Sequence, residues 1–423
     1  MSFFTLDSLS ILMLIVLAIV LVPVVIHSFI YFRDYKTKRG SKIIFFSALL
    51  MLTVALALGY MSNHITMTWV FTEITTLAAG LLIYHHREEL ALEAVWKYVF
   101  VCAISVTFIF IGILFWGLAL LQIDLHELTY DNLMSYAPYM DPFWLKMGYV
   151  FIFAGFTVKM GLFPMFTAGI DAKDNAPGPA SAMLSSVLVN LGFVGIYRCY
   201  AVMVASSEAQ WARIMMLVAA VLTIFIATTY IVKVHNVKRL LAYSCIEHSA
   251  IVIIGLCFGR VGTIAALLHI IMHSFIKSGL FLHYGQLAKV YKSKMIEDMG
   301  DYLNINPFGA LVLLLGLFSI TAIPPSGLFM SELQLFGAML AEGSWLMMAI
   351  VALLLTVLIW AICKIVISIV FLPRPRSYQQ HRFKSFAVEN ITQLVLFLFA
   401  IYIGYFNPSY VSSLIGDAAS LLF

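Results

Sequence analysis

The sequence predicts an all-α polytopic membrane protein with about twelve transmembrane helices. Of its 423 residues, 62% are hydrophobic and only 11% are charged, whereas a water-soluble domain carries about 25% charged residues. Apolar stretches near the ~20 residues that cross a bilayer recur from end to end. The five cysteines are scattered without a CxxC pair. We therefore expect no metal, iron–sulfur or other cofactor in this chain.

The hydrophobic pattern places the spans in the following order along the chain. They lie near 8–32, 43–61, 65–84, 97–122, 146–170, 178–203, 209–232, 241–258, 261–288, 305–342, 345–372 and 386–406. The first run follows MSFFTLD, which lacks a basic segment, so we expect no cleaved signal peptide. The tenth run is too long for one crossing and contains Pro324 and Pro325. Adjacent prolines remove backbone donors, which predicts a broken helix.

Basic residues follow the loop parity that this span count gives. Odd-numbered loops and their flanks hold eighteen: Arg33, Lys36, Lys38, Arg39, Lys42, Arg87, Lys97, Lys173, Lys233, Lys238, Arg239, Lys289, Lys292, Lys294, Arg374, Arg376, Arg382 and Lys384. Even-numbered loops hold four: Lys146, Arg198, Arg213 and Arg260. The positive-inside rule then places the odd loops in the cytoplasm and both termini outside. The net charge of +4 is a topology signal, and we expect no nucleic-acid partner.

Several ionisable residues fall inside the spans, where each costs at least ~2.5–3.5 kcal/mol at the centre of a lone helix if charged. His269, His273 and Lys277 are spaced i, i+4, i+8 and form one stripe on a helix face. Such a stripe is typical of a proton relay. A structural polar face and a metal site on the two histidines are the alternatives, although Lys277 would repel a cation.

Lys159 and Pro164 indicate a second titratable centre at a helix break. Burial disfavours the charged form of lysine, and a nearby carboxylate restores it. Glu73 is the candidate partner, and Glu332 follows the second break by seven residues. Two broken helices with buried charges favour an inverted-repeat ion carrier.

Other buried charges have plainer alternatives. Lys238, Glu247 and His248, near the cytoplasmic end of the span at 241–258, are candidates for a proton inlet. Glu247 and His248 are equally compatible with a helix-bridging pair. Lys364 lies close to a basic loop, which favours snorkelling to the interface or bridging of two helices over chemistry.

Four segments resemble the antiporter-like subunits shared by complex I, Mrp cation/proton antiporters and membrane-bound hydrogenases. They are VKMGLFPMFTAGIDAKDNAPGPASAMLSSVLVNLGFVGIYR, HNVKRLLAYSCIEHSAIVIIG, LLHIIMHSFIKSGLFLHYGQL and IEDMGDYLNINPFGALVLLLGLFSITAIPPSGLFMSELQLF. The last is most similar to the hydrogenase-4 component F branch. The resemblance runs from about residue 60 to 345, and the motifs keep the family's order.

The resemblance implies two inverted five-helix repeats, each with one broken helix, in a single membrane domain at 1–423. We expect two N-terminal helices at 8–61, repeat cores at 65–203 and 209–342, and C-terminal helices at 345–423. By the same resemblance Lys159 is the pumping lysine and Glu73 its partner. His269, His273 and Lys277 form the central hydrophilic axis, and Glu332 leads to the exit.

The chain departs from the family pattern in three places. The first two of fourteen family helices are missing from the pattern, which leaves twelve. Asn190 stands where many relatives carry a lysine or histidine and cannot itself hold a proton. FTAGIDAKD replaces the family's tryptophan and proline after the first break.

The expected function is that of a non-catalytic, proton-translocating subunit in a hydrogenase-type or complex I-like assembly of a prokaryotic cytoplasmic membrane. Nickel–iron or iron–sulfur centres would lie in a peripheral redox arm, and the other partners would be membrane subunits and lipid. One alternative is a cation/proton antiporter that carries Na⁺, or the membrane subunit of an inorganic-carbon uptake pair. Another is a structural anchor that has lost pumping.

The charge asymmetry predicts that both termini face the extracytoplasmic side. A single cysteine introduced between residues 374 and 384 should react with a membrane-impermeant maleimide only after the membrane is opened. Labelling of that cysteine in intact cells would contradict this topology.

Overall fold

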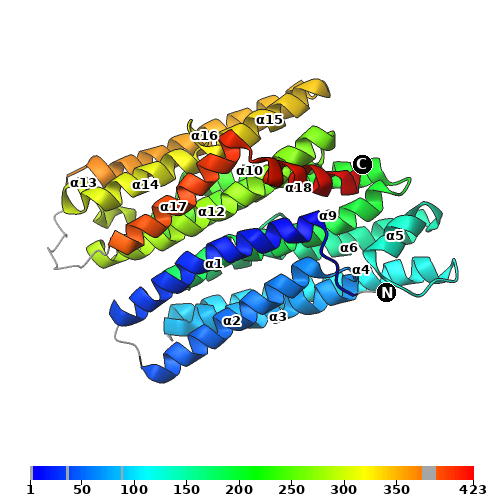
Figure 1. Cartoon of the computed structure of the whole chain (residues 1–423), viewed down its shortest axis with the longest axis horizontal. Coiled ribbons are helices and arrows are strands. Elements are labelled where there is room, and N and C mark those ends of the chain that lie inside the picture. Colours follow the sequence, from blue (N-terminus) through cyan, green and yellow to red (C-terminus); the bar gives the residue numbers. More distant parts are fainter. Residues whose placement is uncertain (1–2, 35–37, 87–88, 374–386) are drawn as a thin grey trace.

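The computed structural model describes residues 3–34, 38–86, 89–373 and 387–423. Its helices run side by side in one elongated bundle, and the two termini lie at the same end of it (Figure 1). Six of the basic loop residues lie outside the described ranges: Lys36, Arg87, Arg374, Arg376, Arg382 and Lys384.

In the described part of the chain, eleven helices are long and apolar enough to span a membrane. They are α1 (Ser8–Asp34), α2 (Arg39–Met61), α3 (Ile65–Ile83), α4 (Glu89–Leu121), α6 (Pro142–Met160), α8 and α9 counted together (Gly178–Ser185 and Val187–Val204), α10 (Ala209–Ile231), α11 (Val237–Leu256), α12 (Gly259–Tyr291), α16 (Trp345–Phe371) and α17 (Ala387–Phe406). The pair α14 (Pro307–Ile320) and α15 (Gly327–Ala341) makes the twelfth. The all-α polytopic prediction and its span count are therefore confirmed.

Shorter helices join or cover these spans. They are α5 (Tyr130–Tyr136), α7 (Thr167–Asn175), α13 (Tyr302–Ile305) and the C-terminal α18 (Ser409–Ala419). The sequence did not predict α18, which packs along α1 and α12. The Tyr197 hydroxyl of α9 donates a hydrogen bond to the Ala418 carbonyl at 2.6 Å and so fixes this helix to the bundle.

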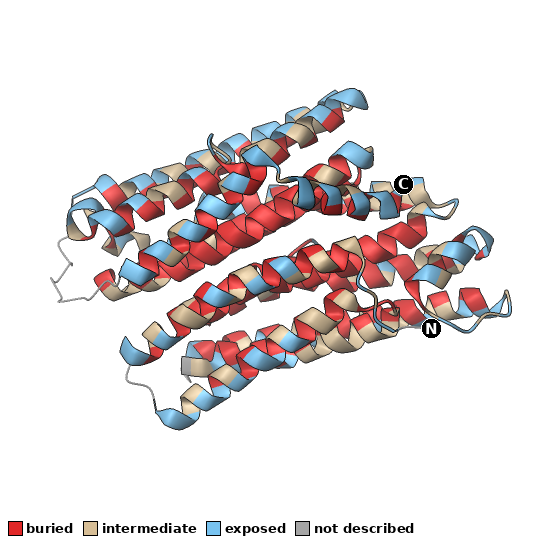
Figure 2. Cartoon of the chain, viewed as in Figure 1, coloured by how far each residue is buried: buried red, intermediate tan, exposed pale blue. Residues whose placement is uncertain are grey.

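The two halves of the bundle repeat one order of neighbours. In the first half α2 packs on α3, α3 on α4 and α4 on α6; in the second, α10 packs on α11, α11 on α12 and α12 on α14. Burial separates inner from outer helices. Of the residues in the apolar 18-residue stretch of α12, 94% are buried, whereas only 28% are buried in the corresponding stretch of α16. Figure 2 shows the inner helices as nearly continuous buried ribbon. The inner helices are the ones that carry the ionisable side chains.

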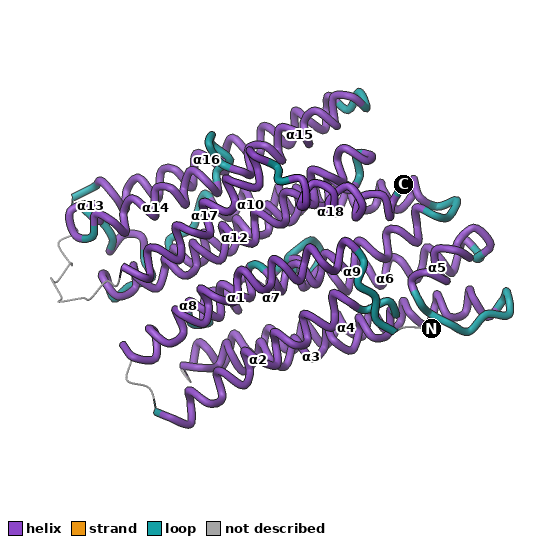
Figure 3. The backbone as a smooth tube through the Cα atoms, viewed as in Figure 1, coloured by secondary structure: helices purple, strands orange, loops and turns teal. Residues whose placement is uncertain are grey.

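Three breaks interrupt the long helices (Figure 3). The first follows α6, where Gly161 adopts φ +78°, a left-handed conformation that glycine tolerates at a helix end; Pro164 lies in this break. The second separates α14 from α15 and contains Pro324 and Pro325. The third, at Ser186 between α8 and α9, was not predicted, because no proline or glycine marks it.

Glycines let α4 and α6 approach closely. A Cβ atom on Gly112 would lie 2.6 Å from the Gly148 carbonyl oxygen, and one on Gly155 would lie 2.6 Å from the Ser105 carbonyl oxygen. The Ser105 hydroxyl donates to the Gly155 carbonyl at 2.5 Å across the same contact. Small residues that bring helix backbones together are a usual source of helix association in lipid. This contact supports the end of α6, where Lys159 lies.

We expect Gly112→Leu to destabilise the fold, because its side chain meets backbone that cannot move aside. Overpacking a tight contact typically costs about 1–3 kcal/mol. Thermal unfolding of the detergent-solubilised chain measures the effect as a lower melting temperature.

Gly117→Leu is the matched control, since a Cβ on Gly117 of the same helix has no heavy atom within 4 Å. Equal melting temperatures for the two variants would show that α4 and α6 are not held by this glycine contact.

Candidate functional site

Lys159 lies in the last turn of α6, buried with 5% of its surface exposed. Its Nζ donates to the Thr76 hydroxyl of α3 at 2.7 Å and to the Tyr98 hydroxyl of α4 at 3.4 Å. Gly192 of α9 packs against its Cβ. Four helices therefore fix the position of this amine.

Glu73 is not within ion-pair distance of Lys159 in this structure. One of its carboxylate oxygens is buried without a hydrogen-bond partner. Thr76, which binds the amine, follows Glu73 by three residues, so the two lie on one side of α3. Sequence reasoning missed Thr76 and Tyr98 as lysine ligands, because hydroxyl groups in membrane helices often bond only to their own backbone.

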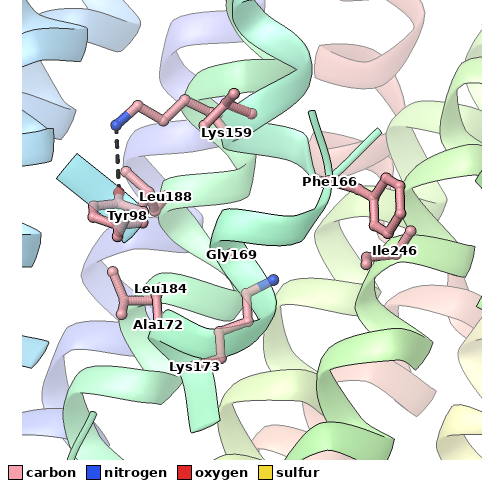
Figure 4. Close-up of a pocket in the computed structure, with 11 residues that line it drawn as sticks. Tyr98, Lys159, Phe166, Gly169, Ala172, Lys173, Leu184, Leu188 and Ile246 are labelled. Atoms are coloured by element: carbon pink, nitrogen blue, oxygen red, sulfur yellow. Dashed lines mark hydrogen bonds between the residues drawn. The ribbon is translucent and has the colours of Figure 1, made fainter. Parts of the chain in front are cut away.

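A small cavity of about 10 Å³ lies beneath Lys159, with room for about one water molecule. Figure 4 shows Lys159 at one end, the buried Lys173 of α7 at the other, and Gly169 between them. Phe166 and Ile246 line its side. The break after α6 borders this space, because Gly161 and Phe166 at its two ends both line the cavity.

Lys238 lies at the start of α11 and lines a wide vestibule of about 830 Å³. Its Nζ donates to the Asp174 carbonyl at 3.1 Å and to the Ala176 carbonyl, and it lies over the Tyr284 ring. Arg239 forms ion pairs with Asp174 at 3.0 Å and with Asp171 at 2.8 Å. The loop between α7 and α8 is thus anchored to α11 beside a solvent-accessible mouth.

The α12 stripe lies wholly inside the bundle. His269, His273 and Lys277 are 2% exposed or less, and the Lys277 Nζ donates to the Leu241 carbonyl at 3.1 Å. The stripe therefore faces α11 over much of its length.

Glu247 and His248 of α11 lie beside this stripe. His248 Nδ1 is 3.0 Å from His269 Nε2, and the rings of His248 and His273 have centroids 5.4 Å apart. His248 therefore bridges α11 and α12, while Glu247 contacts His248 on the same helix at 3.4 Å.

Asn190 lies on α9, two residues before the Gly192 that packs against Lys159, and it contacts α12. Its side-chain oxygen accepts a hydrogen bond from Ser274 of α12 at 3.1 Å, and its amide nitrogen is buried without a partner. Ser278 and Ser186 add a second hydroxyl contact at 2.9 Å, at the break between α8 and α9. The end of the row is Glu332 on α15, 9% exposed. Of the ionisable residues that the sequence singled out in the spans, the structure pairs His248 with His269, leaves Glu73 half-buried and outside ion-pair distance of Lys159, and leaves Lys364 exposed.

The fold and the buried ionisable residues Lys159, His248, His269, His273, Lys277 and Glu332 define the class of protein. It is a polytopic membrane protein with titratable groups in its interior. The model for the family described as "NADH:quinone oxidoreductase/Mrp antiporter, TM" matches residues 62–358. The chain belongs to this family.

Its curated relatives include hydrogenase and quinone oxidoreductase components. The chain is 32% identical over 315 residues to a hydrogenase-4 component F homolog of Methylacidiphilum infernorum, covering 73% of this chain and 66% of the relative. It is 28% identical over 322 residues to NADH-quinone oxidoreductase subunit N 2 of Rhizobium meliloti, covering 74% and 64%. The matched part thus spans slightly less than two thirds of each relative.

Solved structures share the fold. In the Mrp complex from Dietzia sp., one chain superposes with a TM-score of 0.86 at 17% identity and covers 99% of this chain and 84% of its own length. A chain of the membrane-bound sulfane sulfur reductase, an archaeal respiratory membrane complex, gives 0.80 at 22% identity and covers 96% and 91%. The chain is thus an antiporter-like membrane protein of this family, and the two solved neighbours belong to multi-subunit complexes.

Filling the cavity beneath Lys159 tests whether water reaches this lysine from α7. A Cβ on Gly169 has no heavy atom within 4 Å, so Gly169→Val should fold normally while its methyl groups occupy the cavity. We expect proton uptake by reconstituted complex to slow at least about tenfold, equivalent to ~1.4 kcal/mol of added barrier.

Gly337→Val on the exposed side of α15 is the control, because its Cβ is equally free of neighbours. A wild-type rate in the Gly169 variant would mean that protons reach Lys159 by another route.

Proposed function

We propose that this chain translocates protons across a prokaryotic cytoplasmic membrane, as a subunit of a hydrogenase-type or complex I-like assembly. The observation that supports the proposal is a set of buried polar groups in both halves of the bundle. Lys159 and Lys173 line one small cavity, and Asn190 contacts Ser274 on the helix that carries His269, His273 and Lys277. These groups would form one path, with Lys238 at one end and Glu332 at the other. A single buried charge can serve a structural role, whereas proton transfer across the membrane requires titratable groups in both halves of the bundle.

Each link in the row supports one step. Lys159 would accept a proton through the water-sized cavity between it and Lys173. The unpartnered amide nitrogen of Asn190 calls for a buried water, because buried polar atoms are rarely left unpaired. That water would bridge toward His273 and compensate for the absence of a titratable side chain at position 190. The histidine pair and Glu332 would then pass the proton to the extracytoplasmic side.

The driving energy would arise outside this chain. The relatives' printed names associate them with hydrogenase and quinone oxidoreductase, so we propose that nickel–iron or iron–sulfur centres lie in partner subunits. Coupling would be electrostatic, since a charge change at one buried group shifts the protonation of its neighbours. The likeness to an Mrp complex keeps exchange of Na⁺ for protons as a second function, and dependence of proton uptake on Na⁺ would favour it.

Lys159→Arg should stop proton transfer although the positive charge is kept. Arginine does not deprotonate in proteins, so it can hold the site charged but cannot release a proton. We expect a loss of at least about tenfold in proton uptake by reconstituted complex, or ~1.4 kcal/mol in the barrier. Glu73→Gln should fail similarly, because the carboxylate that favours the charged lysine is lost.

Lys364→Arg is the matched control, because Lys364 lies exposed over the Trp360 ring of α16, away from the row. If Lys159→Arg pumps as fast as wild type and Lys364→Arg, Lys159 is not a proton carrier.

A further inference from the structure

Three side chains from three helices converge at the end of the titratable row. His248 of α11, His269 of α12 and Glu332 of α15 each offer a ligand atom, and these atoms lie within 4.8 Å of one another. All three residues are buried. Sequence reasoning considered a metal only on His269 and His273, which are neighbours on one helix. The structure instead pairs His269 with His248 and adds a carboxylate.

The spacing suits a tetrahedral zinc ion. With Zn–N distances of about 2.0–2.1 Å, two ligand atoms on a tetrahedral ion lie about 3.3 Å apart. His248 Nδ1 and His269 Nε2 are 3.0 Å apart, so a small outward movement of the rings accommodates the ion. Two histidines with one carboxylate form a donor set that zinc enzymes use, with a fourth position left for water. Imidazole nitrogens also favour zinc over magnesium or calcium.

Hydrogen bonds around His269 leave its ligand nitrogen free. The Ser331 hydroxyl donates its proton to the Leu328 carbonyl at 2.8 Å, so it must accept from His269 Nδ1–H at 2.9 Å. In the neutral ring, Nε2 then carries a lone pair aimed at His248. A metal-bound histidine usually has its other ring nitrogen fixed in this way.

The His248 side of the cluster is incompletely paired without a metal. If His248 Nδ1–H donates to His269, its Nε2 is a bare acceptor facing the Glu247 carboxylate at 3.4 Å. Both His248 Nε2 and Glu247 Oε2 are in fact buried without a hydrogen-bond partner. Moving the ring proton to Nε2 pairs it with Glu247 and frees Nδ1 for a metal. Metal binding therefore gives partners to His248 Nε2 and Glu247 Oε2, which have none in the metal-free cluster.

The neighbouring charges balance a divalent ion. Glu332 and Glu247 supply two carboxyl groups from α15 and α11 that can ionise when a divalent ion binds, and Lys277 supplies an amine from α12. The Lys277 amine is held by the Leu241 carbonyl, and His273 adds a neutral ring when unprotonated. Two carboxylates against one ammonium favour occupation by a cation.

We propose that His248, His269 and Glu332 form a binding site for Zn²⁺, oriented by Ser331 and Glu247. Bound zinc replaces the proton between the two rings. If the proposed function holds, this occupation closes the proton path at its exit, so zinc inhibits transfer. Protons and zinc compete for the same nitrogens, and the apparent affinity for zinc rises with pH.

Zinc content of the purified complex, measured after equilibrium dialysis against buffered Zn²⁺, tests the site directly. Wild type should bind one saturable Zn²⁺ per copy of this chain, and Co²⁺ in its place should show the visible absorption of tetrahedral N/O coordination. His269→Ala and Glu332→Gln should lose this ion. Ser331→Ala should weaken binding about 10- to 100-fold, because it removes only the orienting partner. His273→Ala is the matched control and should keep it.

The outcomes separate this site from the proposed function. Zinc binding that disappears with His269→Ala and Glu332→Gln supports the zinc site. If the wild-type complex binds zinc in this way but transfers no protons, only the proposed function is contradicted. Binding that persists in both variants would assign the ion to exposed groups such as His235 and Glu297 and overturn the proposal. Absence of saturable binding in a complex that transfers protons would also overturn it, leaving the proposed function intact.

Discussion

The cost of taking a polar group out of water governs this structure. A charged side chain on a lone membrane helix is unfavourable by several kcal/mol, so Lys159 and Lys277 are found only where other helices supply oxygen atoms. The Lys159 amine uses hydroxyl groups from α3 and α4, and Lys277 uses a carbonyl from α11. These contacts decide which helices lie inside. The mainly apolar surfaces of the outer helices are left to face lipid.

Backbone groups obey the same constraint at the helix breaks. The freed amide of Phe163 donates to the Thr223 hydroxyl of α10 at 2.9 Å, so a helix of the second half supports the break in the first. In the second break, the Ser326 hydroxyl donates to the Ser319 carbonyl at 2.7 Å and also caps α15 through the Leu328 amide. Irregular backbone persists in a membrane protein only with such replacement partners. The helix breaks are therefore stabilised by specific hydrogen bonds, and they place backbone polar groups near the ionisable side chains.

Sequence reasoning predicted the fold well, because hydrophobic length and proline position are local signals. All twelve spans, the stripe on α12 and the two proline breaks could be predicted from residue spacing. The break at Ser186 could not, since a serine within an apolar run carries no local mark. Contacts between helices could not be predicted from the sequence either. Spacing along one helix places His269 near His273, but only packing brings His248 and Glu332 to it, and the same holds for Thr76 and Tyr98 at Lys159.

The position of Thr76 one turn from Glu73 on α3 bears on how fast the lysine can change state. Three residues of helix correspond to about 4.5 Å of rise, which lies within the swing of a lysine's four-carbon chain. Rotation about side-chain bonds would then exchange the neutral hydroxyl partner for the carboxylate while every helix stays in place. Helix displacements take microseconds or longer. A partner exchange at the buried Lys159 would therefore not have to wait for those slower displacements.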